Sequence, residues 1–300
     1  MSKKSTKKWI IGTLITAPLL FLAAPISVGL ALTHPKGRKT IGSPKDHELF
    51  FESITFTSKY DGLTLSGWWI PAEIPTDKSV IMVHGYKGER SMHSINGLSL
   101  AKSLHNQGYN VFMFDFRNSG ESQGRRTGIG FYEQHDLESA IDYLVEQKHQ
   151  QSVALLGWSM GASTSLITGS KHPSVRAIIA DSPFSELETY LKNNLSVWSK
   201  LPDKPFTSII MLSVQGLLRI HPKEVSPLRA VQTNNDKAYL LIHSEQDEKI
   251  PHQESVNLYE HIHSSKKELW LTKKALHVRS YKLMKKEYEQ KIFEFLGKNL

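Results

Sequence analysis

From about residue 51 onward, short apolar runs alternate with segments whose apolar positions recur at helical spacing. The first two runs, 54–57 and 63–70, are joined through Asp61-Gly62, a dipeptide that predicts a hairpin between strands. The later runs are short and apolar, which is typical of strands covered on both faces. We expect these strands at residues 80–83, 111–114, 153–156, 177–180, 238–242 and 268–271.

Helical patterns separate these runs. Between residues 132 and 147, Leu137, Ile141, Leu144 and Val145 share one face of a helix, and further helices are expected at about 91–107 and 278–296. Alternation of strands and helices implies parallel strands joined by right-handed crossovers. The sequence therefore predicts an α/β fold: a mostly parallel central sheet with helices on both faces, and functional residues at the carboxyl ends of the strands.

The interval from about 183 to 235 interrupts this alternation. It holds apolar helical segments at 187–198 and 206–218 but no convincing strand, and we interpret it as an inserted lid. Its large apolar residues either line a pocket for an acyl group or only pack the lid onto the body. They are Trp198, Phe206, Ile209, Ile210, Met211 and Leu217.

The N-terminal part has a different character. Residues 1–8 form a short basic N-terminus, and residues 9–32 carry no charge over a length sufficient to cross a membrane as a helix. We expect a transmembrane anchor at 9–32. The alternative is a secretory signal segment cleaved near Gly29 to Ala31. A linker at 33–50 and a globular domain at 51–300 complete the predicted organisation.

The location of charge supports the membrane interpretation. Residues 1–48 hold eight Lys/Arg against Asp46 and Glu48, which gives +6 and leaves only +2 of the total +8 for the rest. Basic residues that flank an apolar segment favour headgroups and anionic lipid. The nearly neutral domain shows no nucleic-acid-binding pattern. We expect the N-terminus inside the cell and the domain outside the cytoplasm, either anchored or, after signal cleavage, secreted.

The chain contains no cysteine, which excludes disulfides, cysteine zinc sites and thiol catalysis. Its 14 histidines lack the spacing of a metal motif, and the close pair His261 and His263 is interpreted as a solvated helix end. We therefore expect neither a metal nor a cofactor.

The chemistry is predicted by Gly157-Trp-Ser-Met-Gly161, which follows an apolar strand and precedes a segment of small residues. A G-x-S-x-G sequence in this context predicts a nucleophile elbow, a strained strand-to-helix turn that exposes the serine hydroxyl. Glycines on either side allow the close approach that the turn requires. Ser159 is therefore the predicted nucleophile.

A serine hydroxyl needs a base and an acid that orients the base. Asp247 follows the strand at 238–242 and His277 follows the strand at 268–271, in the chain order Ser, Asp, His that this architecture uses. Glu245 and Glu248 share the loop of Asp247 and are alternatives for the acid. The histidines on earlier strand ends are weaker candidates for the base and are expected to bond to loop backbone. They are His84, His93 and His243.

The tetrahedral intermediate of acyl transfer needs backbone N–H donors directed at its oxyanion. One donor is expected from Met160, the residue after the nucleophile. The other is expected from Tyr86 in the loop His84-Gly-Tyr-Lys-Gly88, where glycines let the backbone come close to a substrate.

Together these motifs make the chain resemble the α/β-hydrolase superfamily, close to its membrane-anchored Bem46-like and bacterial cell-surface esterase or peptidase-like members. The resemblance rests on 84–88, 115–122, 157–161, 181–184, 247–251 and His277. It implies that Asp115 and Arg117 belong to the scaffold. Ser244 departs from the pattern, since many relatives carry glycine there, which affects the turn and not the triad.

The function expected from the residues and the resemblance is a carboxylesterase- or lipase-like serine hydrolase that cleaves an ester or related acyl bond of a small molecule through an acyl-enzyme. A serine peptidase or amidase on the same triad is the second hypothesis. The third is a catalytically idle, membrane-tethered binding module.

Overall fold

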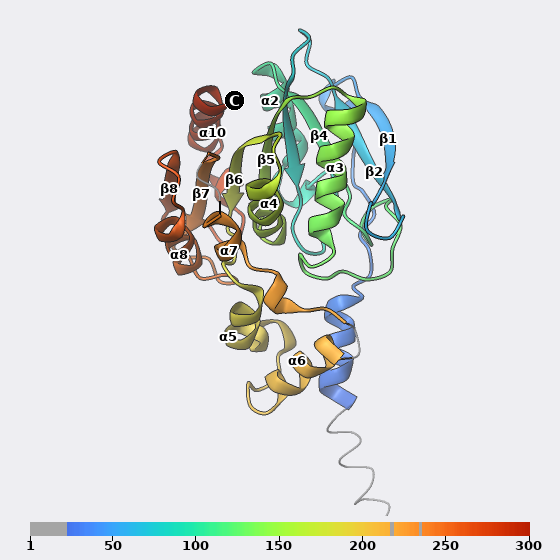
Figure 1. The fold of residues 1–300 in the computed structure, drawn as a ribbon, viewed down its shortest axis with the longest axis vertical. Coiled ribbons are helices and arrows are strands. Elements are labelled where there is room, and N and C mark those ends of the chain that lie inside the picture. The colour runs from blue at the N-terminus through green and yellow to red at the C-terminus, as the bar shows by residue number, and fades with distance from the viewer. Residues whose placement is uncertain (1–22, 217–218, 234–235) are drawn as a thin grey trace, which may run out of the picture.

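The structure, a computed structural model, describes residues 23–216, 219–233 and 236–300. In these ranges the centre is one sheet in the order β1-β2-β4-β3-β5-β6-β7-β8, and only β2 runs against the other strands (Figure 1). The strands are β1 (Glu52–Thr57), β2 (Thr64–Ile70), β3 (Lys78–Val83), β4 (Asn110–Phe114), β5 (Ser152–Trp158), β6 (Val175–Asp181), β7 (Ala238–Ser244) and β8 (Lys267–Thr272). The predicted fold class and the predicted hairpin are confirmed.

The strand order reverses at β3, which has β4 on one side and β5 on the other. Such a reversal opens a crevice at the carboxyl ends of the two central strands, because the connections leave toward opposite sides. Val83 at the end of β3 lies opposite Gly157 in β5. The loop at 84–88 and the turn at Ser159 therefore leave the sheet side by side.

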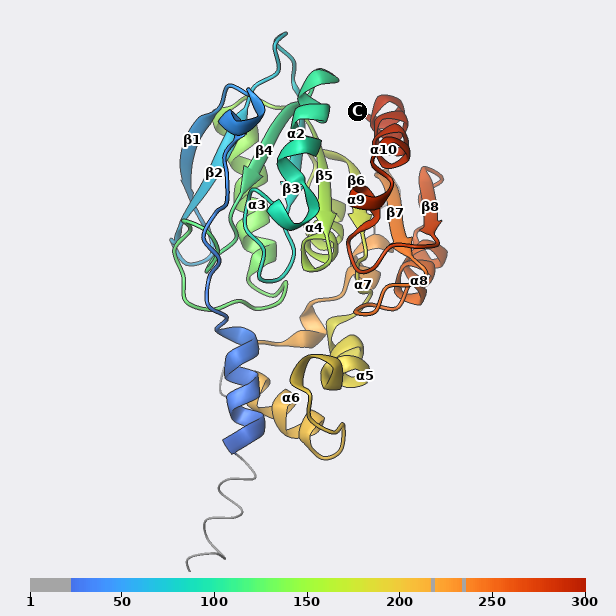
Figure 2. The ribbon, with the colours of Figure 1, turned by 180° about the vertical axis from the view of Figure 1, so that it is seen from behind.

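Helices cover both faces of the sheet (Figures 1 and 2). Alternate residues of each strand point to opposite faces, so Val80 and Met82 join one apolar core while Ile81 and Val83 join the other. The first core packs against α2 (Gly97–Asn106), α9 (Ser280–Leu283) and α10 (Lys285–Asn299). The second packs against α3 (Glu133–Gln147), α4 (Met160–Lys171), α7 (Pro227–Val231) and α8 (Gln253–His261).

Two predicted helices are interrupted. The segment expected at 91–107 begins as the short turn η2 (His93–Ile95) and becomes α2 only after Asn96, whose φ of 60° is left-handed. The segment expected at 278–296 is divided at Met284, whose backbone is not helical. Apolar periodicity continues across both breaks, so it did not reveal them.

The lid projects from the carboxyl edge of the sheet (Figure 1). It consists of α5 (Leu187–Ser199), α6 (Phe206–Gly216) and η3 (Pro222–Glu224), around a third apolar core that includes Leu191, Leu195, Ile210 and Met211. The lid was predicted to extend to 235, but Val231 at the end of α7 already packs in the core beneath the sheet.

Residues 23–33 form a helix that lies beside α6 in both views (Figures 1 and 2). Small side chains permit the contact: a Cβ on Gly29 would lie 2.8 Å from Oγ of Ser213. The segment predicted as a linker then follows the body, where η1 (Pro44–His47) forms and the Arg38 carbonyl accepts a hydrogen bond from the N–H of Gly120 at 3.0 Å.

The predicted anchor at 9–32 is only partly visible, because residues 9–22 lie outside the described residues. No helix in the described ranges is both long and apolar enough to cross a membrane.

Helix α10 is attached to the sheet by a buried polar contact. The hydroxyl of Tyr288 donates to Asp181 Oδ2 at 2.8 Å, and the hydroxyl of Ser182 donates to Asp181 Oδ1 at 2.9 Å. Burial raises the pKa of Asp181 to about 6, against the opposing effect of these two donors. The pKa of Asp181 is therefore higher in the folded chain than in the unfolded chain. As pH rises from the unfolded pKa to the folded pKa, the contribution of this carboxyl group to the free energy of unfolding decreases.

Tyr288→Phe removes one donor from a buried carboxyl group. We expect a loss of about 1–3 kcal/mol in the free energy of unfolding, and a larger loss at pH 8 than at pH 5, because the ionised carboxylate depends more on the donor. Urea denaturation of the parent and the variant at the two pH values measures this loss. Tyr259→Phe is the control, since its hydroxyl makes no hydrogen bond in the described part of the chain. An equal loss at both pH values would contradict the prediction.

Candidate active site

The turn between β5 and α4 holds Ser159 in a strained conformation, with φ 54° and ψ −121°. Its neighbours leave no room for side chains. A Cβ on Gly161 would lie 2.3 Å from the Val83 carbonyl oxygen, and one on Gly157 would lie 2.5 Å from the Gly161 carbonyl oxygen. The Ser159 N–H donates to the Asp181 carbonyl at 2.8 Å. This is the geometry that the G-x-S-x-G sequence predicts.

The structure brings Ser159, His277 and Asp247 together from three loops at the carboxyl edge. His277 Nε2 lies 2.9 Å from Ser159 Oγ, and His277 Nδ1 lies 2.7 Å from Asp247 Oδ2. With the proton on Nδ1 directed at the carboxylate, Nε2 is free to accept the serine proton. The three side chains can therefore act as nucleophile, base and orienting acid.

Asp247 is held as a carboxylate. Burial would raise its pKa, but hydrogen bonds from His243 and His277, and the backbone N–H of Ile250, hold the pKa well below its usual range. Oδ1 accepts the N–H groups of Lys249 at 2.8 Å and Ile250 at 2.9 Å. An ionised acid fixed in this way both orients the imidazole and stabilises its protonated form.

The two glutamates of the same loop do not contact the ring of His277 as Asp247 does. Glu245 and Glu248 are both exposed. Glu248 accepts the backbone N–H of His277 at 3.0 Å and makes no bond to its ring. Of the three carboxylates considered, only Asp247 contacts the imidazole.

His243 contributes a contact that the sequence did not predict. Its Nε2 lies 2.9 Å from the Ile250 carbonyl, as expected for a histidine bonded to loop backbone, but also 3.3 Å from Asp247 Oδ2. Its Nδ1 lies 2.7 Å from Ser255 Oγ. His243 therefore holds the acid loop together. The sequence feature that could have predicted this contact is the position of His243 at the end of β7, four residues before Asp247.

The other two histidines lie apart from the triad. The buried ring of His84 accepts the N–H of Phe116 at 3.0 Å through Nε2 and bonds to the Gly85 carbonyl at 2.8 Å through Nδ1, which requires a neutral tautomer. Burial lowers the pKa of His84, consistent with that tautomer. His93 is exposed.

The loop at 84–88 lies directly against the elbow. A Cβ on Gly85 would lie 3.0 Å from the Trp158 carbonyl oxygen, and the loop closes on itself where the Gly88 N–H donates to the Gly85 carbonyl at 2.9 Å. In the described part of the chain, the N–H groups of Tyr86 and Met160 donate to no protein acceptor. Both predicted oxyanion donors are thus free to bind an anionic oxygen.

Two hollows meet at Ser159, and both are also lined by Tyr86 and Trp198. The first, which we call the lid pocket, is apolar, has a volume of about 40 Å³ and lies beneath α5. The second, which we call the open cleft, has a volume of about 520 Å³ and extends past His277. The lid pocket is further lined by Leu32, Ile129, Met160, Phe184, Tyr190, Leu191, Leu195 and Ile250.

Of the lid residues considered from the sequence, Trp198 lines both hollows. Ile210 and Met211 line a small apolar cavity of about 10 Å³ deeper in the lid, which shares Leu191 and Leu195 with the lid pocket. Phe206 and Ile209 line neither hollow nor this cavity. Leu217 lies outside the described residues.

The N-terminal segment and the lid are both bonded to the site. The hydroxyl of Tyr86 donates to the Leu32 carbonyl at 2.6 Å, and its ring meets the Trp198 ring edge-on at 6.1 Å. Trp198 Nε1 donates to the Tyr190 hydroxyl at 2.7 Å, which donates to the Lys249 carbonyl at 3.1 Å. Residues before the predicted domain thus form part of the wall.

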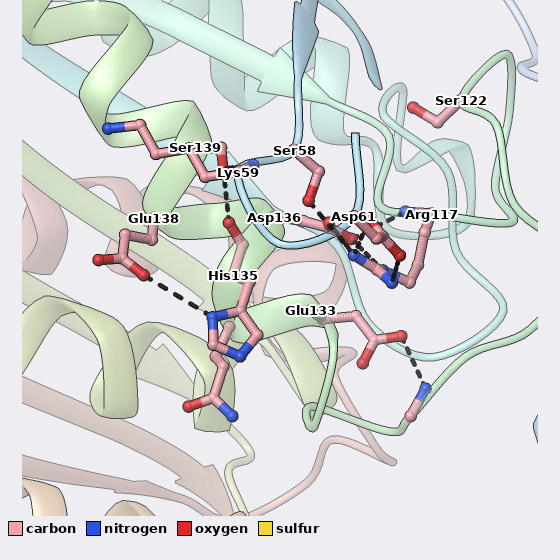
Figure 3. Close-up of polar contacts among 12 residues, drawn as sticks. Ser58, Lys59, Asp61, Arg117, Ser122, Glu133, His135, Asp136, Glu138 and Ser139 are labelled. Carbon is pink, nitrogen blue, oxygen red and sulfur yellow. Dashed lines mark hydrogen bonds and ion pairs between the residues drawn. The ribbon is translucent and has the colours of Figure 1, made fainter. Parts of the chain in front are cut away.

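Arg117 and Asp115 are occupied by protein partners. The Arg117 guanidinium binds both carboxylate oxygens of Asp136 in α3, at 2.8 and 2.6 Å, and Asp61 in the hairpin turn at 2.8 Å (Figure 3). Asp115 accepts the N–H groups of Arg90 and Glu121. These contacts tie loops to the sheet, the scaffold role that the resemblance implies. In the described ranges no cluster of three or more His, Asp or Glu could hold a metal ion.

Comparison with known proteins agrees with the observed fold. Residues 78–207 match a family model for the alpha/beta hydrolase fold. The chain is 32% identical over 240 residues to the uncharacterized protein YqkD of Bacillus subtilis, covering 78% of this chain and 76% of YqkD. It is 31% identical over 216 residues to the uncharacterized protein YfhR of Escherichia coli, covering 69% of this chain and 67% of YfhR.

Among solved structures, the esterase Pf2001 of Pyrococcus furiosus is similar with a TM-score of 0.73 and 27% identity, over 89% of this chain and 99% of the esterase. Est1E from Butyrivibrio proteoclasticus, solved with bound ferulic acid, shares the fold at 16% identity, with a TM-score of 0.63 over 81% of this chain and 99% of that chain. The chain belongs to the α/β-hydrolase family.

Proposed function

We propose that this hydrolase cleaves carboxylic esters by serine catalysis, with Ser159 as nucleophile, His277 as general base and Asp247 as its orienting acid. The observation that carries the proposal is the 2.9 Å contact between Ser159 Oγ and His277 Nε2. It lies next to the N–H groups of Tyr86 and Met160, which have no acceptor among the described residues. The similarity to an esterase from Pyrococcus furiosus supports it.

In the proposed reaction, Ser159 Oγ attacks the ester carbonyl carbon while His277 Nε2 takes the hydroxyl proton. The carbonyl oxygen becomes an oxyanion that accepts hydrogen bonds from the N–H groups of Tyr86 and Met160. Collapse breaks the bond to the alcohol oxygen, which receives the proton from His277. A water activated by His277 then hydrolyses the acyl-enzyme and regenerates the serine.

The shape of the site supports a short acyl group. A cavity of about 10–15 Å³ holds about one water molecule. The lid pocket, at about 40 Å³, therefore has room for a short acyl chain of about two to four carbons. The same triad also serves amides, and the open cleft of about 520 Å³ has room for part of a peptide, so a peptidase or amidase is the second candidate.

A fluorophosphonate probe tests the nucleophile. We expect stoichiometric labelling of the full chain at Ser159 and its loss in Ser159→Ala, because the probe reacts only with an activated serine. Mass spectrometry of the labelled peptide locates the site. Ser163→Ala is the matched control, since its hydroxyl is buried and bonded to the Phe184 carbonyl. A chain that takes up no probe would favour the idle binding module. Labelling of Ser159→Ala equal to that of the parent would reject Ser159 as the nucleophile.

A series of p-nitrophenyl esters tests the acyl preference. We expect the acetate and butyrate to be hydrolysed faster than the octanoate, and peptide p-nitroanilides to be much slower. Leu195→Ala opens the lid pocket toward the deeper cavity, so the octanoate-to-butyrate ratio of kcat/KM is expected to rise about tenfold. The ratio is independent of the fraction of folded enzyme.

Leu212→Ala is the control for Leu195→Ala, because Leu212 is 69% exposed on α6 and lines neither hollow. An unchanged ratio in Leu195→Ala would place the acyl chain elsewhere. Faster hydrolysis of the anilides than of the esters would favour the peptidase. The full chain is used throughout, because Leu32 lines the lid pocket.

We further propose that residues 9–32 attach the enzyme to a membrane with the catalytic domain outside the cytoplasm. The uncharged stretch, its four preceding lysines, and the exposed Leu30 and Leu212 on adjacent helices support this placement. We expect the full chain in the membrane fraction after washing with salt, and its domain to be digested by protease added to intact cells. Digestion only after lysis would place the domain inside, and recovery of a shortened chain in the medium would indicate signal cleavage.

A further inference from the structure

The open cleft is lined by four basic side chains that come from four separate segments. Lys87 lies in the loop after β3 and Lys249 in the acid loop after β7. Arg279 follows β8, and Arg38 belongs to the N-terminal segment that runs along the body. Segments far apart in the sequence thus deliver positive charge to the hollow that contains Ser159 and His277.

The two carboxylates in the same lining are already engaged. Glu89 is buried, and it accepts the N–H and the hydroxyl of Ser91, both at 2.7 Å. Glu248 accepts the N–H of His277 at 3.0 Å. Neither forms an ion pair with a basic side chain of the cleft within the described residues.

The basic side chains of the cleft have no carboxylate partner in the described part of the chain. Lys87 Nζ lies 5.1 Å from the ring centre of Tyr86, and Lys249 Nζ lies 5.4 Å from the ring centre of Trp198. Tyr86 and Trp198 line both the lid pocket and the open cleft. Both lysines line the open cleft, beside rings that line the two hollows in common.

Several basic residues elsewhere on the body are paired. Lys59 contacts Asp142, Lys148 contacts Glu52, and Arg117 contacts Asp136. Outside residues 1–48 the whole chain carries only +2. The lining has four basic side chains against two carboxylates, an excess of two positive charges. Because a net positive charge in a concave site attracts an anionic ligand, this local excess points to a substrate rather than to general solubility.

We propose that the open cleft binds the alcohol part of the substrate and that this part carries an anionic group, a phosphate or a carboxylate. The inference rests on the proposed function. The substrate class is then a short-chain acyl ester of an anionic alcohol, with its acyl group in the lid pocket and its alcohol on the His277 side. His277 Nε2–H protonates the leaving alcohol oxygen as the acyl–oxygen bond breaks, and the anionic group passes through the reaction unchanged.

Three butyrate esters with one phenolic framework test this assignment on the full chain. They are the esters of methyl 4-hydroxybenzoate, which is neutral, of 4-hydroxybenzoate, and of 4-hydroxyphenyl phosphate. Each kcat/KM is divided by the rate of hydrolysis by hydroxide, which corrects for leaving-group reactivity. We expect at least one anionic ester to exceed the neutral ester about fivefold or more, mainly through KM, and the excess to shrink as salt is added. The faster anionic ester identifies the group as phosphate or carboxylate.

Variants of basic residues test whether the cleft causes the preference for anionic esters. Combining Arg38→Gln with Lys249→Gln removes two charges, and the anionic-to-neutral ratio is expected to fall about fivefold. Lys298→Gln removes an exposed charge at the end of α10, outside the cleft, and is expected to keep the parent's ratio. The ratio compares two substrates in one preparation, so a partly folded variant does not distort it.

A parent enzyme that hydrolyses the neutral ester as fast as both anionic esters, or a double variant with an unchanged ratio, would overturn the inference while leaving the esterase proposal intact. Failure to hydrolyse any of the three esters, together with an unlabelled Ser159, would overturn the proposed function and this inference with it.

Discussion

The close packing of three backbone segments at the carboxyl edge of the sheet is the constraint on which the site depends. Glycine at 157 and 161 lets the elbow lie against the end of β3, and that contact forces Ser159 into its positive φ. The loop at 84–88 leaves the same strand and presses on the elbow through Gly85. The proposed nucleophile and the proposed oxyanion donors are therefore positioned by one packing arrangement.

The same arrangement explains what the sequence could predict. Buried parallel strands are continuous apolar runs, so their positions, and hence the loops that carry Ser159, Asp247 and His277, follow from the one-dimensional pattern. His243 was underestimated, because its contact with Asp247 depends on how the acid loop folds back. The attachment of the N-terminal part to the body was not predicted from the sequence. It uses the backbone carbonyls of Leu32, in the predicted anchor, and Arg38, in the predicted linker, and backbone groups are the same for every residue type.

The lid illustrates a second limit. Its apolar helices were predicted from periodicity, but periodicity does not distinguish residues that line a hollow from residues that fill a core. The structure assigns Trp198 to the wall beside Ser159, and Ile210 and Met211 to a deeper layer. The distinction depends on the rotation of each helix about its axis, which is set by the packing of α5 against α6 and the body.

The hydrogen bonds from Trp198 to Tyr190 and from Tyr190 to the Lys249 carbonyl join the lid to the loop that holds Asp247. An outward movement of α5 must break this chain two residues from Asp247, and it also separates Trp198 from Tyr86. The position of α5 and the order of the acid loop are thus mechanically linked. For the proposed serine hydrolase, this link means that α5 in its present position and an ordered loop around Asp247 occur together.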